Sequence, residues 1–179
     1  MREPFIVRWK GRIPADRVCS GVVSMLDVFP TVVKQCHARP PEKPLDGIDI
    51  WPLLSGEAQD IPREPLLYFE NVNLECSRWK NWKLHVARSN TVKWSPPPTG
   101  GVRQFILPRP ELYDLSRDPD ESYDVARQNP GIVKEMTARM EAAMKTFPPD
   151  IQQAWAETKA RKAALTQTGN VTKEEPLHD

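Results

Sequence analysis

The sequence predicts an α+β fold, in which a small antiparallel β-sheet packs against a C-terminal amphipathic helix. Short apolar segments separated by turn residues recur between residues 65 and 115, a pattern typical of antiparallel strands. A stripe of apolar residues at three- and four-residue spacing follows, which indicates an amphipathic helix. Proline accounts for 19 of the 179 residues, roughly twice its usual frequency, so long regular elements are excluded over most of the chain.

The first sixty residues are expected to hold one strand and one helix. Residues 4–9 (PFIVRW) form a continuous apolar run, which is typical of a strand buried on both faces of a sheet. A helix is predicted over residues 27–37, because Asp27 can cap it and apolar residues recur there at helical spacing. A connector follows, with a short helical turn that Asp49 can cap and that ends at Gly56.

Three short strands are predicted next, over residues 65–70, 74–79 and 82–87. The last two are expected to form a hairpin around Lys80-Asn81. In the third strand apolar and more polar residues alternate, the period of two expected of a sheet with one covered and one wetter face. Residues 88–110 contain several prolines, a Gly100-Gly101 pair and no periodicity, which predicts an unusually long loop.

The C-terminal third is expected to be one strand followed by two helices. The strand covers residues 111–115, and an Asp-Pro-Asp-Glu turn follows it. A helix is predicted over residues 130–147, because Asn129 and Pro130 suit its first positions and the apolar stripe continues to its end. Asp150 can cap a second helix that runs to about Leu165, and residues 166–179 have too little apolar content to stay ordered.

Charge and composition argue against two classes of partner. Lys and Arg total 25 and Asp and Glu total 24, so the chain lacks the basic excess expected of a nucleic-acid binder or of a protein held at an anionic membrane. No apolar run approaches the ~20 residues that span a bilayer. The three cysteines form no CxxC pair, so neither a zinc site nor a disulfide framework is expected. The chain is predicted to be soluble, with no nucleic acid and no membrane as partner.

A search for catalytic residues yields few candidates. His85 is the one histidine expected to be fixed near another polar group, because Lys83 lies two positions away on the same strand face; the simpler interpretation is a half-exposed sheet histidine. The acidic residues between Asp114 and Asp124 lack the glycine of a calcium loop, so a solvated turn is expected there. The residues alone therefore indicate an α+β domain without an active site of its own.

Five segments in order, covering residues 1 to about 147, resemble the C-terminal portion of the type I sulfatases, the arylsulfatase and N-acetylgalactosamine-6-sulfatase group. MREPFIVRWKGRIP resembles the family stretch with x-Arg-x-Pro, a strand and a Trp-Pro-Gly turn, although Lys10 replaces the proline. VSMLDVFPT is similar to a Ser-x-x-Asp-Leu-x-Pro-Thr helix start. The other three matches are PLDGIDIWPLLSG, the WKLHV strand, and ELYDLSRDPDESYDVA with the helix after it.

The resemblance implies hydrolysis of a sulfate ester by the full-length enzyme. Family members use a formylglycine, made from a C/S-x-P-x-R motif, together with a calcium ion and basic side chains around the sulfate. The motif is absent after Cys19, Cys36 and Cys76, and the metal-binding aspartates belong to family segments that this sequence does not contain. We therefore assign no catalytic residue and no metal ligand, and expect the chain alone to bind no cofactor; calcium and formylglycine are implied only for the full-length family.

The resemblance gives a supporting role to one residue, and the chemistry of the predicted loop suggests a binding role for three. Arg2 matches the arginine of x-Arg-x-Pro, and is assigned a structural role beside a family lysine that would precede it. Within the predicted long loop, Trp94 lies between Lys93 and Arg103, an aromatic platform with cations that suits a sulfated sugar. These three residues are the candidates for the rim of the substrate pocket; the simpler alternative is that the predicted loop is merely mobile.

The resemblance also implies a domain organisation and a partner. Residues 1–60 are interpreted as the remnant of an alkaline-phosphatase-like α/β sulfatase domain, residues 61–147 as the smaller antiparallel subdomain, and residues 148–179 as a helix with a disordered tail. The expected partners are the missing N-terminal catalytic part and a sulfated small molecule or sugar. The alternative is a non-catalytic binding or interaction module derived from a sulfatase. The sequence identifies neither the sulfate ester nor the compartment. Members of the family are often periplasmic, secreted or lysosomal.

Overall fold

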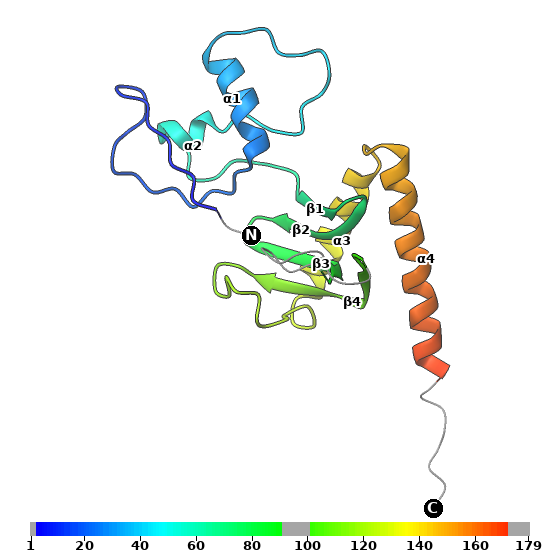
Figure 1. Cartoon of the computed structure of the whole chain (residues 1–179). Helices are drawn as coiled ribbons and strands as arrows, with labels where there is room; N and C mark the ends of the chain where they lie inside the picture. The colour runs from blue at the N-terminus through cyan, green and yellow to red at the C-terminus, as the bar shows by residue number, and fades with distance from the viewer. Residues whose placement is uncertain (1–2, 91–100, 172–179) are drawn as a thin grey trace, which may run out of the picture. The chain divides into compact units, whose positions relative to one another are not determined.

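The chain folds as two compact units, residues 1–63 and 64–179 (Figure 1). The structure is a computed structural model that describes residues 3–90 and 101–171, with side chains to residue 165. Within these residues, no helix combines the length and the apolar character that crossing a membrane requires.

The first unit contains short helices joined by irregular segments. A 3₁₀ turn, η1 (Met25–Asp27), leads into α1 (Val28–Gln35), which confirms the predicted helix with slightly shorter bounds. The second helix, α2 (Trp51–Ser55), ends at Gly56 in the left-handed conformation (φ 93°), as predicted, and Asp49 Oδ1 accepts a hydrogen bond from Trp51 N at 2.9 Å. The predicted capping by Asp27 is wrong, because its side chain makes no capping hydrogen bond to α1; Asp27 is instead fully buried, and its carboxylate binds groups outside the helix.

Residues 4–9 differ from their prediction, because they form no strand in the part of the chain that the structure describes. The segment is irregular, and its apolar side chains are exposed: Ile6 to 91% and Phe5 to 44%. A strand exists only when its N–H and C=O groups pair with a neighbour. The first unit, as described from residue 3, contains no strand with which this segment could pair.

The second unit is built on a four-stranded antiparallel sheet in the order β1-β2-β3-β4. The strands are β1 (Leu66–Glu70), β2 (Asn73–Trp79), β3 (Trp82–Ser89) and β4 (Gln104–Asp114). The first three match their predictions, and β2 and β3 form the expected hairpin around Lys80-Asn81, with Trp79 opposite Trp82. The α+β prediction is therefore confirmed.

The long loop predicted over residues 88–110 is wrong at both ends. β3 continues to Ser89, and β4 begins at Gln104 rather than at residue 111. The pairing shifts between His85, opposite Glu111, and Ala87, opposite Ile106, so that residues 107–110 form a bulge on β4. Pro108 and Pro110 lie in or beside this interruption on an edge strand, where their missing N–H groups remove no ladder hydrogen bond.

Two helices complete the second unit, α3 (Pro130–Met144) and α4 (Pro149–Val171). α3 starts after Asn129 as predicted and ends three residues early, whereas α4 continues to Val171, so residues 166–171 belong to a helix and not to the predicted disordered tail. Figure 1 shows α3 behind the sheet and α4 beside it. The methionine face of α3 packs on the sheet, forming two core clusters: Leu74, Val86, Met140, Met144 and Trp155; and Leu84, Leu112 and Met136.

Candidate functional site

The face of the sheet opposite the helices carries a cluster of charged and aromatic side chains. Leu84 and Val86 of β3 point to the helices, so Lys83 and His85, which alternate with them, lie on the other face. Both are nevertheless buried, with only 9% and 7% of their surface exposed. The prediction of a wetter face with a half-exposed His85 is therefore wrong, because this face is covered as well.

The group that covers Lys83 and His85 is Glu121, from the turn between β4 and α3. Lys83 Nζ donates to Oε1 of Glu121, and His85 Nε2 lies 2.7 Å from Oε2. Burial alone acts to raise the pKa of Glu121, but the hydrogen bonds and charges of His85 and Lys83 outweigh it and lower this pKa from 4.5 to about 2. Glu121 was expected in a solvated turn, and instead its carboxylate is a fixed, ionised partner of two strand residues.

A second carboxylate on the same face is held in a similar way. Arg88 donates to Oε2 of Glu111 through Nη2 at 2.7 Å and through Nε at 3.2 Å. The hydroxyl of Tyr113 also donates to Oε2 of Glu111, at 3.0 Å, and burial together with this hydrogen bond raises the pKa of Tyr113. The ring of Tyr113 stands edge-on to His85, with centroids 5.7 Å apart, so the two carboxylate sites form one array. We call these six residues the polar array: Lys83, His85, Arg88, Glu111, Tyr113 and Glu121.

The chemistry of the polar array is that of a fixed, charge-paired surface and not of a hydrolytic centre. Each carboxylate is already engaged by cations, so neither is free to act as a base. The thiol of Cys76 lies opposite His85 on β2, and its burial raises its pKa to about 11, which keeps it protonated. In residues 3–90 and 101–165, no three His, Cys, Asp or Glu side chains are grouped so as to hold a metal ion.

The candidate site residues taken from the sequence lie elsewhere. Arg2, Lys93 and Trp94 fall outside the described residues. Arg103 is exposed just before β4, and its backbone is joined to Asn90: Arg103 N donates to Asn90 Oδ1 at 2.6 Å, and Asn90 N donates to Arg103 O at 3.1 Å. The structure thus does not bring Arg103 into the polar array.

Sequence reasoning found two members of the polar array and missed the other four. Lys83 and His85 were detectable because the period of two places them on one face of a strand. Glu121 is 38 residues from Lys83 and 36 from His85, so no local spacing connects it to them. The one available signal was an acidic residue in the turn that directly follows the neighbouring strand.

Comparison with known proteins identifies relatives of both units. A profile of the family described as the C-terminal region of aryl-sulfatase matches residues 61–173. Human arylsulfatase D is 30% identical over 162 residues, covering 80% of this chain, and mouse steryl-sulfatase is 33% identical over 138 residues, covering 68%. Human arylsulfatase A is 31% identical over 169 residues, covering 83%.

The match covers only a part of each relative. This chain spans 27% of arylsulfatase D, 22% of mouse steryl-sulfatase and 32% of arylsulfatase A. Among solved structures, the PsFucS1 sulfatase from Pseudoalteromonas sp. superposes with a TM-score of 0.66 at 23% identity, over 78% of this chain and 29% of that chain. At this identity the superposition supports the fold alone.

Proposed function

Because the chain belongs to the sulfatase family through the C-terminal region of aryl-sulfatase, we propose that it is the C-terminal part of an enzyme that hydrolyses sulfate esters. Its own role is to complete the catalytic domain and to contribute one wall of the substrate site. The names of the relatives differ in substrate, from aryl to steryl to N-acetylgalactosamine-6-sulfate esters, so the substrate class stays as broad as a sulfated small molecule or sugar.

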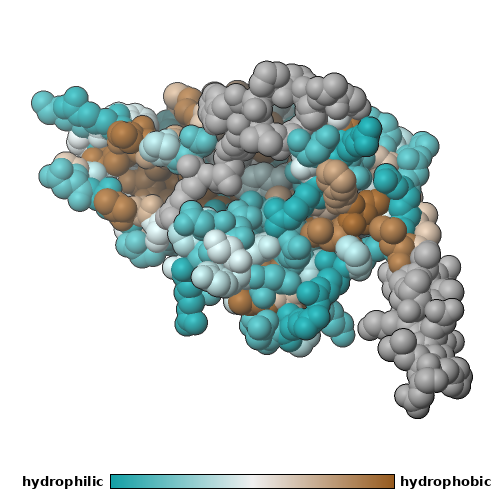
Figure 2. Space-filling view, turned by 60° about the horizontal axis from the view of Figure 1, so that its bottom comes forward, coloured by the Kyte–Doolittle hydropathy of each residue, from teal (hydrophilic) through white to brown (hydrophobic). Residues whose placement is uncertain are grey.

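The observation that carries this proposal is the apolar surface of the first unit. Phe5, Ile6, Val7 and Trp9 are 42–91% exposed, and Met25, Leu26, Phe29 and Val32 around α1 are 52–77% exposed. Hydrophobic residues of this unit are visible at the left of Figure 2. Many exposed large apolar side chains in one small unit are typical of a protein that another polypeptide covers. The missing N-terminal catalytic part is the occupant that the family membership supports, with residues 4–9 pairing as a strand in its sheet.

The chain itself does not fit the family's catalytic groups. None of Cys19, Cys36 and Cys76 is followed by the proline and arginine required for formylglycine formation. Carboxylates of the described residues form no group of three ligands for calcium, and those of the polar array are taken by Lys83, His85 and Arg88. We therefore propose that residues 1–179 are inactive alone, and derive no catalytic step from them.

A chimaera tests the proposal directly. The matching C-terminal region of human arylsulfatase A is replaced by this chain, and turnover of an aryl sulfate is compared with that of arylsulfatase A lacking the region. We expect a folded chimaera with turnover above the truncated control, and loss of turnover when Ile6→Glu is introduced. A folded chimaera with no turnover, or purified catalytic part that does not co-purify with this chain, would instead support a non-catalytic interaction module.

The rim assignment of Lys93, Trp94 and Arg103 needs a separate test in full-length enzymes. Loops on a rigid sheet commonly carry specificity, and two hydrogen bonds between Asn90 and Arg103, one to the Asn90 side chain and one from its backbone, hold the start of β4 close to the end of β3. Exchange of residues 91–103 between two full-length sulfatases is expected to move the ratio of kcat/KM for a sulfated sugar against a small aryl sulfate. An unchanged ratio in both directions would remove these residues from the rim.

A further inference from the structure

The second unit contains a hollow on the helix-covered side of the sheet, away from the polar array. It has a volume of about 480 Å³ and is lined by side chains from β3, β4, α3 and α4. This volume falls within the ~300–1,000 Å³ that is usual for small-molecule pockets. Hydrophobic residues are exposed at the right of Figure 2, in the part of the molecule that holds α4.

The wall of the hollow is apolar and belongs to the core. Val86 and Ile106 line it from the sheet, Met140 from α3 and Trp155 from α4, and each of the four is at least 91% buried. Val86, Met140 and Trp155 are already held by their neighbours in the first core cluster. A ligand entering the hollow would therefore meet a preformed surface, which lowers the entropy cost of binding.

The rim of the hollow is net positive. Lys159 and Lys162 of α4 line it together with one acid, Glu141 of α3, which lies 3.1 Å from Lys159 Nζ. Lys162 is half-buried, and burial lowers the pKa of its ammonium group. Lys159 Nζ also lies 5.6 Å from the centroid of the Trp155 ring.

One donor in the wall has no acceptor. The indole Nε1 of Trp155 is buried and makes no hydrogen bond to the described residues. A buried Trp N–H usually finds a partner, and leaving it without one is unfavourable. An oxygen-bearing ligand seated beside the indole would supply the missing acceptor after a small side-chain movement.

We propose that this hollow binds a small organic anion, with an aromatic or alkyl body against Val86, Met140 and Trp155 and an acidic group at Lys159 and Lys162. The apolar body displaces water from the wall, and the acidic group gains from two cations at the rim. Inorganic sulfate lacks the body, and a neutral aromatic lacks the charge, so either alone is expected to bind more weakly. The proposal does not depend on sulfatase activity.

The test follows the indole N–H signals of the whole chain by ¹⁵N–¹H NMR, with 2-naphthalenesulfonate as the probe. The chain has six tryptophans, and Trp155→Phe identifies the Trp155 signal. We expect that signal to shift saturably with the probe while the signals of Trp79 and Trp82, outside the hollow, stay in place. Inorganic sulfate should produce no saturable shift, and 2-naphthalenemethanol should bind at least several-fold more weakly.

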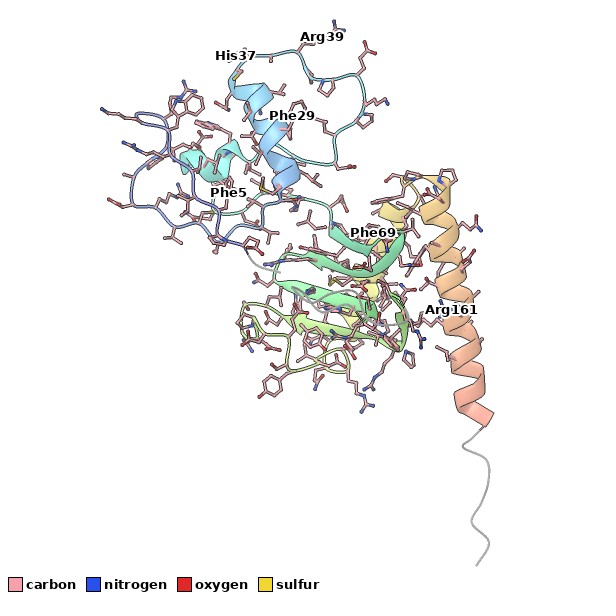
Figure 3. The ribbon with its side chains drawn as sticks, in the orientation of Figure 1. Phe5, Phe29, His37, Arg39, Phe69 and Arg161 are labelled. Carbon is pink, nitrogen blue, oxygen red and sulfur yellow. The ribbon has the colours of Figure 1, made fainter. Side chains whose placement is uncertain are left out.

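Matched variants separate a built site from adhesion to the surface. Lys162→Gln removes a rim cation. This substitution is expected to lower the affinity for the probe by up to about fivefold, the range of one partly exposed ion pair. Arg161→Gln removes an exposed charge from the same helix outside the lining, and should leave the affinity within twofold (Figure 3). Ala163→Phe places a ring at the rim and should abolish the Trp155 shift, whereas Ala160→Phe should not.

Three results would overturn the proposal. A Trp155 signal that does not move at millimolar probe means that the hollow takes no such anion. Equal shifts of all the tryptophan signals mean non-specific adhesion. Equal binding of the neutral alcohol, or equal loss in Arg161→Gln and Lys162→Gln, means that the rim cations do not select the ligand.

Discussion

Arg63 binds the fully buried carboxylate of Asp27 with both terminal nitrogens, Nη1 at 2.8 Å from Oδ2 and Nη2 at 3.4 Å from Oδ1. The same carboxylate accepts hydrogen bonds from Ser24 N at 2.7 Å and from Ile48 N at 3.0 Å. One side chain therefore joins three separate segments of a unit that has little regular structure. Charge-assisted bonds of this kind are about twice as strong as neutral ones.

Removing Arg63 is expected to unfold the first unit selectively. In Arg63→Met the charge of Asp27 stays buried without its partner, a change that costs about 3–5 kcal/mol. Hydrogen exchange should become fast in α1 and α2 while the sheet stays protected. Lys34→Gln is the control, because the Lys34–Asp49 pair is exposed and its loss should leave protection unchanged. Unaltered exchange of α1 in Arg63→Met would contradict the role given to this pair.

Glu121→Gln is expected to destabilise the second unit in a pH-dependent way. The pKa of Glu121 is lowered to about 2 in the folded chain, so its contribution is present above pH 4.5 and is lost as the pH falls through 2. At pH 7 the free energy of unfolding should fall by about 2 kcal/mol, and this difference should shrink toward zero near pH 2. Urea titrations between pH 7 and pH 2 measure it, with the exposed Glu135→Gln as control.

Met140→Ala is expected to destabilise the second unit through a cavity. Met140 is 1% exposed and packs with Leu74 and Val86 between α3 and the sheet. Truncation of a buried methionine costs about 2–5 kcal/mol. Met25→Ala is the matched control, because Met25 is 77% exposed and its truncation creates no cavity. Equal shifts of the thermal midpoint in the two variants would show that the α3–sheet interface is not a packed core.

Residues 4–9 are expected to exchange their amide hydrogens fast, whereas residues 82–87 and 132–144 exchange slowly. The first segment is irregular and exposed in the described structure, while β3 and α3 carry the core. Hydrogen exchange with mass spectrometry on the whole chain measures all three. Uniform protection in a monomeric sample would mean that the first unit is stable without a covering partner, against the function proposed above.

Purified residues 1–179 are expected to hydrolyse no aryl sulfate and to bind no calcium specifically. The nucleophile motif is absent, and no three-ligand group occurs among the described residues. A chromogenic aryl sulfate and calorimetric calcium titration measure the two properties. Turnover above buffer that survives a second, orthogonal purification would overturn the first expectation, and saturable calcium binding the second.

Local patterns predicted most of the regular structure, and contacts remote in sequence account for the rest. The hairpin around Lys80-Asn81 and the start of α3 at Asn129 depend on turn chemistry and periodicity, which the sequence displays directly. The early start of β4 at Gln104 was missed because prolines normally end strands. Here Pro108 and Pro110 accompany a bulge on an edge strand, and only the three-dimensional pairing with β3 shows that they are tolerated.

The polar contacts also divide into those that local patterns predict and those that depend on remote segments. Lys83 and His85 share a strand face by period, but Glu121 and the Asp27–Arg63 pair depend on segments that meet only after folding. Residues 4–9 show that a local pattern can also predict an element that does not form. Their composition predicts a strand, yet a strand needs a neighbour, and no neighbour exists for them in residues 3–63.

The burial of Cys76 makes the two units chemically distinguishable without any substitution. Its pKa of about 11 leaves almost no thiolate at neutral pH, whereas Cys19 and Cys36 are exposed, and both lie in residues 1–63. A maleimide reagent applied to the native chain will therefore mark the first unit alone. Fluorophores or spin labels attached in this way report on that unit specifically. The slower rate at which Cys76 is labelled then measures the rate at which the sheet opens.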